Sequence, residues 1–297
     1  MSEATPSAAP EAWTIARVLA WASEDFRGRG MESARLDAEL LLSEALGLDR
    51  IRLIMESRRP LSPGELAGFR ELIKRRRAGE PIAYILGRRE FFGLSFRVDR
   101  RVLIPRPDTE ALVEVALERT QARYMFGTAL DLCTGSGCVA ISFAKRRPTW
   151  RVTATDLSEP ALALACENAL RLGAVFGMRF LSGDLFAPLA ADERFDLVTA
   201  NPPYVPEADV AALDPGIRDF EPKLALSAGA DGLALIRRIL QEGVSHLGPG
   251  GVLALEVQYD QADRVVELFA EAGLVDVEKR RDLGGHERVV SGRRPEV

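Results

Sequence analysis

The sequence predicts an α/β protein that carries a small helical bundle at its N-terminal end. After residue 108, apolar runs of strand length alternate with helical patterns, which is typical of a parallel sheet with helices on both faces. Before residue 79 the apolar residues recur only at helical spacing. The last two strand-like runs, Val275–Lys279 and Arg288–Ser291, lie too close together for a crossover helix and therefore predict an antiparallel hairpin.

The N-terminal third divides into a leader and a bundle. Residues 1–12 are polar and rich in alanine and proline, without the layout of a signal peptide, and we expect a disordered leader. Residues 13–86 predict the bundle, whose first helix places apolar residues at i, i+3, i+4 and i+7: Ile15, Val18, Leu19 and Ala22. Ser62-Pro63-Gly64-Glu65 predicts a capping box with proline at the first helical position.

Residues 87–108 predict a β-hairpin that connects the bundle to an α/β domain over residues 109–297. The polarity alternates from Gly87 to Leu103, and Gly93 marks a turn. Pro105-Arg106-Pro107 is stiff, and we expect Asp108 or Thr109 to cap the next helix.

Composition excludes several classes of protein. At 297 residues and 47% hydrophobic, the chain can bury one large core and one small one. A net charge of −5 argues against a duplex-DNA partner, and the lack of 18 consecutive apolar residues argues against a membrane span. Three cysteines and two histidines give neither a zinc spacing nor a disulfide framework, so we expect no metal site and a reducing cytosol.

A glycine-rich loop follows the predicted strand Ala129–Leu132 and precedes a helix. It reads Cys133-Thr134-Gly135-Ser136-Gly137-Cys138, and its two glycines would let the backbone approach a ligand. Because Ala140 stands where a dinucleotide fingerprint has its third glycine, a position that tolerates alanine, the spacing alone does not identify the ligand.

Three aspartates at strand ends narrow the choice of ligand. Asp131 would repel a pyrophosphate but attract a cationic sulfonium and amino group. Asp156 is placed to accept from both ribose hydroxyls, and Asp184 with the apolar Leu185 could hold an adenine. This set favours S-adenosyl-L-methionine over NAD. The alternative is that the aspartates are helix N-caps.

The tetrapeptide Asn201-Pro202-Pro203-Tyr204 follows the predicted buried strand Phe195–Ala200. The Asn201 side-chain oxygen and the Pro202 carbonyl could accept hydrogen bonds from the two N–H groups of a planar amide. This would point the nitrogen lone pair at a methyl donor. Tyr204 could stack on that flat group. Asn201, Pro202 and Tyr204 are therefore the candidate catalytic residues; the alternative is an ordinary Asn-Pro turn.

These motifs resemble the protein-(glutamine-N5) methyltransferases that methylate the Gly-Gly-Gln glutamine of class 1 peptide chain release factors. Further segments carry the resemblance: Arg35–Leu41, Gly79–Gly87, Phe91–Gly93, Leu103–Glu110, Phe220–Pro222 and Glu287-Arg288. Cys133 departs from the glycine of many relatives. The resemblance implies a Rossmann-like, seven-stranded class I methyltransferase sheet and the product S-adenosyl-L-homocysteine. It implies that Cys133–Gly137, Asp156, Leu185 and Asn201 line the cofactor, and that Asn201–Tyr204 bind the substrate glutamine.

The expected partner is a class 1 release factor, recognised in part by the bundle, with no direct nucleic-acid contact and no membrane. Three alternatives remain: a glutamine methyltransferase for a ribosomal protein, an adenine-N6 nucleic-acid methyltransferase, and a non-catalytic cofactor-binding protein. The segment Pro105–Glu110 favours the release-factor branch. No basic target-recognition region is found, and the intact Asn201 favours an enzyme.

Two segments each have two interpretations. The basic run Lys74–Arg77 is either a solvated helix end that complements the macrodipole or a contact for an acidic release factor or RNA. The long segment Val205–Ala230 is expected to form a wall of the substrate pocket. Within it, Arg218 and Glu221 either pair as a structural clamp, which we favour, or contact the substrate.

Overall fold

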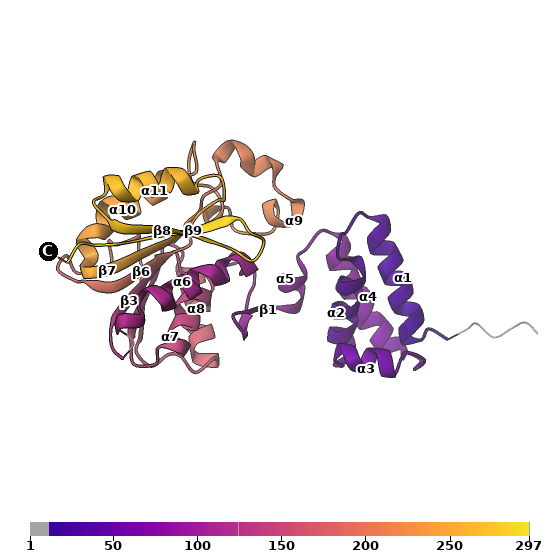
Figure 1. The fold of residues 1–297 in the computed structure, drawn as a ribbon. Helices are drawn as coiled ribbons and strands as arrows, with labels where there is room; N and C mark the ends of the chain where they lie inside the picture. Colours follow the sequence, from indigo (N-terminus) through magenta and orange to yellow (C-terminus); the bar gives the residue numbers. More distant parts are fainter. Residues whose placement is uncertain (1–11, 124, 297) are drawn as a thin grey trace, which may run out of the picture. The chain divides into compact units, whose positions relative to one another are not determined.

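The computed structural model describes residues 12–123 and 125–296, which divide into two compact units at Leu86 and Gly87 (Figure 1). Most of the leader expected at residues 1–12 lies outside the described residues. Within the described chain, no helix has both the length and the apolar character needed to cross a bilayer.

The N-terminal unit is helical, as predicted. Its helices are α1 Ile15–Gly28, α2 Ala34–Leu46, α3 Arg50–Met55, α4 Pro63–Arg77 and α5 Ile82–Leu86. Their apolar faces share one core that includes Ile15, Leu41, Leu53 and Phe69. The predicted capping box is present, because Ser62 accepts from the Glu65 backbone and the Glu65 side chain accepts from Ser62.

The basic run at the end of α4 pairs with acidic groups of its own unit. Lys74 and Arg75 bind Glu71 and Glu80, while Arg76 binds Asp37 and Arg77 binds Asp25, with N–O distances of 2.7 to 2.8 Å. The interpretation as a solvated helix end is wrong for Arg76, whose side chain is only 19% exposed. Arg75, Arg76 and Arg77 therefore join α4 to other parts of the unit, while Lys74 pairs with Glu71 on α4 itself.

The second unit begins with the predicted β-hairpin, β1 Arg88–Phe91 and β2 Leu94–Arg97. Phe92 and Gly93 form its turn with φ angles of 51° and 74°, the double left-handed conformation of a tight hairpin. Phe91 and Phe96 pack edge to face and join the core beneath α6 and α7. The hairpin is thus an integral part of the second unit.

A seven-stranded sheet forms the centre of the second unit and confirms the predicted fold class. Its strands are β3 Thr128–Leu132, β4 Arg151–Asp156, β5 Met178–Ser182, β6 Phe195–Ala200, β7 Leu247–Glu256, β8 Val275–Arg281 and β9 Glu287–Arg293. They lie in the order β5-β4-β3-β6-β7-β9-β8. The first five in this order are parallel, and β8 and β9 form the predicted antiparallel hairpin.

Helices cover both faces of this sheet (Figure 1). One face carries α6 Glu110–Arg119, α7 Cys138–Arg146 and α8 Glu159–Arg171. The other carries α10 Ala234–His246 and α11 Ala262–Glu271. The long segment after β6 contains the short helices η3 Glu207–Ala212, α9 Pro215–Arg218 and η4 Lys223–Ala225, and η2 Gln121–Arg123 follows α6.

The order of the strands positions the site. The chain runs outward from β3 through β4 to β5, then returns to the other side of β3 with β6. Leu132 of β3 pairs with Ala200 of β6, so Cys133 and Asn201 leave the sheet side by side. Ligands bind open α/β sheets at such a reversal, outside the carboxyl ends of the strands.

Candidate active site

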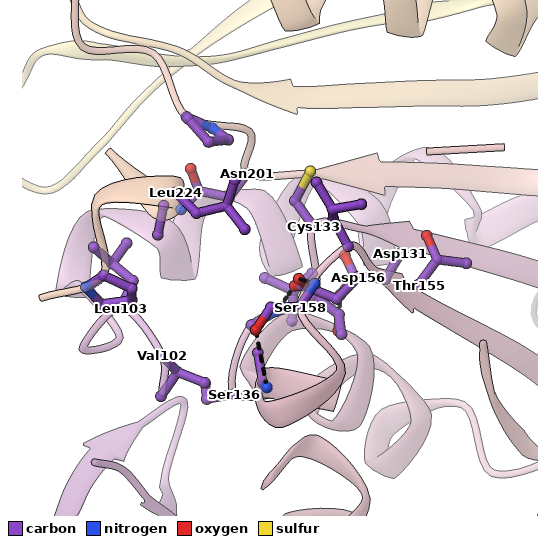
Figure 2. Close-up of a pocket in the computed structure, with 18 of the residues that line it drawn as sticks. Val102, Leu103, Asp131, Cys133, Ser136, Thr155, Asp156, Ser158, Asn201 and Leu224 are labelled. Carbon is purple, nitrogen blue, oxygen red and sulfur yellow. Dashed lines mark hydrogen bonds between the residues drawn. The ribbon is translucent and has the colours of Figure 1, made fainter. Parts of the chain in front are cut away.

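A cavity of about 260 Å³ lies at this reversal of strand order. Figure 2 shows Asn201 and Leu224 on one side and Asp156, Ser158 and Ser136 on the other. Most of the candidate site residues line it: Asp131, Cys133, Thr134, Gly135, Ser136, Asp156, Asp184, Leu185, Asn201 and Pro203. Gly137, Pro202 and Tyr204 are not part of its lining.

The two glycines of the loop are required for different structural reasons. Gly135 has a φ of 54°, and a Cβ there would meet no protein atom within 4 Å, so the space beside it is open to a ligand. Gly137 has a φ of 79°, and a Cβ there would lie 2.8 Å from Ile141 Cδ1 and 3.1 Å from Ala165 Cβ. Gly137 thus permits α7 and α8 to pack closely, while Gly135 permits approach to the loop.

Asp131 is a buried carboxyl that holds the start of the loop. The hydroxyls of Thr134 and Thr199 each donate to it at 2.7 Å, one from the loop and one from β6. Burial raises the pKa of Asp131 to about 6. Its negative charge is therefore close to the cavity yet shielded from solvent, which suits a cationic ligand.

Asp156 joins the end of β4 to the glycine loop. One carboxylate oxygen accepts from the Gly135 N–H and the other from the Ser158 N–H, both at 2.8 Å. Burial is the main influence on its pKa, which is raised. A carboxylate has about four lone-pair sites, so Asp156 can still accept from a diol. The cap residues of α7 and α8 are Gly137 and Ser158, so neither helix uses an aspartate as its N-cap.

The third aspartate has a partner that the sequence did not predict. Asp184 forms two hydrogen bonds with Arg238 of α10, at 3.2 and 3.0 Å, and both residues line the cavity. Leu185, next to it, is buried and has a φ of 49°. Arg238 lies far along the chain on a helix whose other charges point to solvent, so no sequence pattern singled it out.

Asn201 is fixed by a residue expected to serve as a helix cap. Its Nδ2 donates to Thr109 Oγ1 at 3.2 Å. Thr109 is the N-cap residue of α6, one of the two positions expected, but its side chain makes no cap hydrogen bond, because the 3₁₀ turn η1 Pro107–Thr109 leads directly into α6. Thr109 thereby remains available to Asn201.

Pro202 and Tyr204 flank Pro203, which lines the cavity, but do not line it themselves. Pro202 is buried, and no donor among the described residues reaches its carbonyl oxygen. The Tyr204 hydroxyl lies 3.5 Å from Glu256 Oε1, and burial raises the pKa of Tyr204, so the hydroxyl stays protonated and can donate. Glu256, at the end of β7, is a buried carboxyl beside Tyr204 that sequence reasoning missed because it ends an apolar strand.

The segment after Tyr204 walls the cavity with Pro222, Leu224, Ala225 and Ser227. The expected clamp between Arg218 and Glu221 is wrong. Arg218 binds its exposed neighbour Asp219, whereas the buried Glu221 accepts from Arg106 at 2.6 Å and from the Ile104 N–H at 3.2 Å. The clamp therefore joins this segment to the residues before α6.

Comparisons with known proteins agree with this geometry. A family model described as the PrmC N-terminal domain matches residues 17–87, and one described as the methyltransferase small domain matches residues 108–213. The release factor glutamine methyltransferase of Geobacter sulfurreducens is 46% identical over 96% of this chain and 98% of its own. That of Bordetella pertussis is 46% identical over 87% of this chain and 94% of its own.

A solved structure of the hMettl16 catalytic domain, in complex with the MAT2A 3'UTR hairpin 6, has a TM-score of 0.56 and 15% identity. It covers 73% of this chain and 80% of that one, and it shows a shared fold. The fold and the site together define a methyltransferase. The near full-length relatives are more specific: this chain belongs to the family of release factor glutamine methyltransferases.

Proposed function

We propose that this enzyme transfers a methyl group from S-adenosyl-L-methionine to the side-chain amide nitrogen, N5, of the glutamine in the Gly-Gly-Gln motif of class 1 peptide chain release factors. One observation carries the proposal: the pairing of β3 with β6 brings Asn201 to the same cavity as the glycine loop. The near full-length relatives named for this activity support the choice of substrate.

The residues that line the cavity fit S-adenosyl-L-methionine, which supplies a methyl group on a cationic sulfonium. The open space beside Gly135 accommodates a ligand against the loop backbone. Asp156 would accept from the ribose hydroxyls, and Leu185 would contact the adenine, with the Asp184–Arg238 pair beside it. The buried charge of Asp131 favours the cationic end of the cofactor. The product would be S-adenosyl-L-homocysteine.

Asn201 and Pro202 would prepare the substrate amide. A carboxamide nitrogen is a poor nucleophile because its lone pair is delocalised into the carbonyl. Asn201 Oδ1 and the Pro202 carbonyl would accept hydrogen bonds from its two N–H groups and direct the nitrogen lone pair toward the methyl group. No base is needed before attack, since the nitrogen becomes acidic once it is methylated. The gain in rate then comes from positioning and electrostatics.

The two units would contribute differently to recognition. All of the cavity-lining residues belong to the second unit, so the glutamine side chain would be bound there. The N-terminal helical unit would contact another part of the release factor, which makes the folded partner a better substrate than an isolated peptide. Because release factors act in translation, the reaction would take place in the cytoplasm.

An assay with three separate substrates tests this proposal. Purified enzyme and radiolabelled methyl donor are incubated with a release factor, with a ribosomal protein or with duplex DNA, each in its own reaction. We expect label on the release factor alone. Label only on the ribosomal protein or only on the DNA would overturn the choice of substrate, and the Asn201→Ala variant provides the background for each arm.

A further inference from the structure

A buried asparagine lies between the hairpin and the glycine loop. Asn168 of α8 is 0% exposed, although asparagine is mostly found at the surface of proteins. Its Oδ1 accepts from the Arg97 N–H at 2.8 Å, and its Nδ2 donates to the carbonyls of Arg97 and Ser136, both at 3.0 Å. A backbone N–H can only donate and a carbonyl can only accept, so these partners fix which end of the amide is oxygen and which is nitrogen.

The two contacts with Arg97 satisfy an edge of the hairpin. Arg97 ends β2, and β1 and β2 form a sheet of two strands. The outer edge of such a strand presents N–H and C=O groups that need partners. The Asn168 amide takes both groups of one residue, as a neighbouring strand would. The chain then continues to Arg101 and Val102, which line the cavity, so α8 anchors the start of this wall.

The contact with Ser136 orients one peptide group of the glycine loop. The Ser136 carbonyl accepts from Asn168. The N–H of the same peptide group, that of Gly137, donates to the Thr134 carbonyl at 2.8 Å. Because a peptide group is planar, holding its oxygen and its N–H fixes its orientation. Figure 2 places Ser136 on the side of the cavity that also carries Asp156. The oriented peptide therefore adjoins the expected cofactor site.

We propose that Asn168 is a positioning residue for the cofactor, because it holds the Ser136–Gly137 peptide in the orientation that binds S-adenosyl-L-methionine and joins it to the hairpin. The inference rests on the proposed function, since it takes the cavity as the cofactor site. Asn168 does not line the cavity and acts through Ser136, which does. Without a donor to the Ser136 carbonyl, the peptide can adopt other orientations, and only the fraction in the competent one binds.

Hydrogen exchange of the ligand-free protein, followed by nuclear magnetic resonance, tests this role without any assay of activity. Asn168→Leu removes the whole amide at similar size. Asn168→Asp keeps an acceptor for the Arg97 N–H, but an ionised carboxylate cannot donate to Ser136. The Gly137 amide should exchange about 10-fold faster in both variants, and the Arg97 amide faster in Asn168→Leu alone. A Gly137 amide that exchanges at the wild-type rate in both variants would overturn the inference.

Binding and kinetics should separate the cofactor from the chemical step. Asn168→Leu and Asn168→Asp should each weaken the binding of S-adenosyl-L-methionine by about 10-fold, the scale for leaving a buried carbonyl without its donor. With a release factor and saturating cofactor, kcat should stay within about threefold of the wild type, because the lost interaction concerns binding. Calorimetric affinities equal to that of the wild type in both folded variants would contradict the inference.

Two controls separate this role from a general loss of stability. Thr120→Val removes the hydrogen bonds that a buried hydroxyl makes to α6. Glu167→Gln changes the residue next to Asn168, which binds the side chains of Arg97 and Arg101 at the surface. Both variants should bind the cofactor as tightly as the wild type. A loss in Thr120→Val equal to that in Asn168→Leu would assign the effect to stability and overturn the inference.

The wild type gives a further test if the Asn168 variants fail to fold. Saturating S-adenosyl-L-methionine should slow the exchange of the Arg97 amide together with that of Gly137, although Arg97 does not line the cavity. Slower exchange at Gly137 alone would overturn the inference. If the wild type binds S-adenosyl-L-methionine but methylates no release factor, the proposed function fails, while the affinities and exchange rates still decide the role of Asn168.

Discussion

Asn201 at the end of β6 donates a hydrogen bond from Nδ2 to Oγ1 of Thr109, at 3.2 Å, at the start of α6. This contact joins the segment expected to accept the substrate amide to the segment that leads from the hairpin into the sheet. In the structure the Asn201 amide nitrogen donates and the Thr109 hydroxyl accepts. The side chain is therefore prepared before any substrate arrives, which is the condition for electrostatic preorganisation.

Replacing Asn201 with alanine should separate binding from chemistry. Asn201→Ala should keep the affinity for S-adenosyl-L-methionine close to that of the wild type but lower kcat by about 10²–10³-fold, the scale for losing one preorganised polar contact. Calorimetry measures the first and methyl transfer the second. Equal losses of affinity and of rate would mean that Asn201 serves only to maintain the structure.

Asp156 should be required for the cofactor rather than for the chemical step. Asp156→Ala should weaken binding of S-adenosyl-L-methionine by about 1.5–3 kcal/mol, the range for hydrogen bonds to a charged group. Asp156→Asn retains the shape and one acceptor oxygen, so its loss should be smaller. Affinity that does not change in either variant, measured by calorimetry, would refute the ribose role.

The burial of Glu256 should also be visible in the stability of the protein. Its folded pKa of about 7 lies above the ordinary value of 4.5, so its contribution to stability is complete below pH 4.5 and is lost as the pH rises to 7. Glu256→Gln has no such loss, and its stability relative to the wild type should rise across this window by up to about 3 kcal/mol. Urea unfolding at several pH values measures it. A constant difference would contradict the buried ionisation.

The Arg106–Glu221 pair should contribute far more to the stability of the protein than the Arg218–Asp219 pair. Arg106→Met would leave the buried Glu221 carboxylate without its cation and should destabilise the protein by ~3 kcal/mol. Arg218→Met is the matched control, because both Arg218 and its partner are exposed, and it should leave the stability nearly unchanged. Urea unfolding compares them; equal losses would show that the clamp does not stabilise the segment after Tyr204.

The sequence predicted those parts of the protein that local pattern determines. Buried strands such as Phe195–Ala200 read as continuous apolar runs, and both hairpins and the Ser62 cap have short-range signals. The strand-end positions of Asp131, Asp156 and Asn201 followed directly, because the carboxyl ends of parallel strands meet at one edge.

Pairings between distant residues were not predictable in this way. Glu221 lies three residues from Arg218, yet it pairs with Arg106 because burial brings the two segments together. Thr109 stands at the N-cap of α6, as expected, but its hydroxyl accepts from Asn201 and makes no cap bond, because a 3₁₀ turn leads directly into the helix. Arg76 was expected to be a solvated charge, but it forms an ion pair with Asp37 on another helix. Such choices depend on tertiary contacts that no local pattern records.

Tandem mass spectrometry of a release factor, after incubation with the enzyme and S-adenosyl-L-methionine, tests the central claim most directly. We predict a mass gain of one methylene unit on the side chain of the Gly-Gly-Gln glutamine, present with the wild type and nearly absent with Asn201→Ala. A release factor that remains unmodified at that glutamine, or carries the methyl group at another residue, would contradict the account.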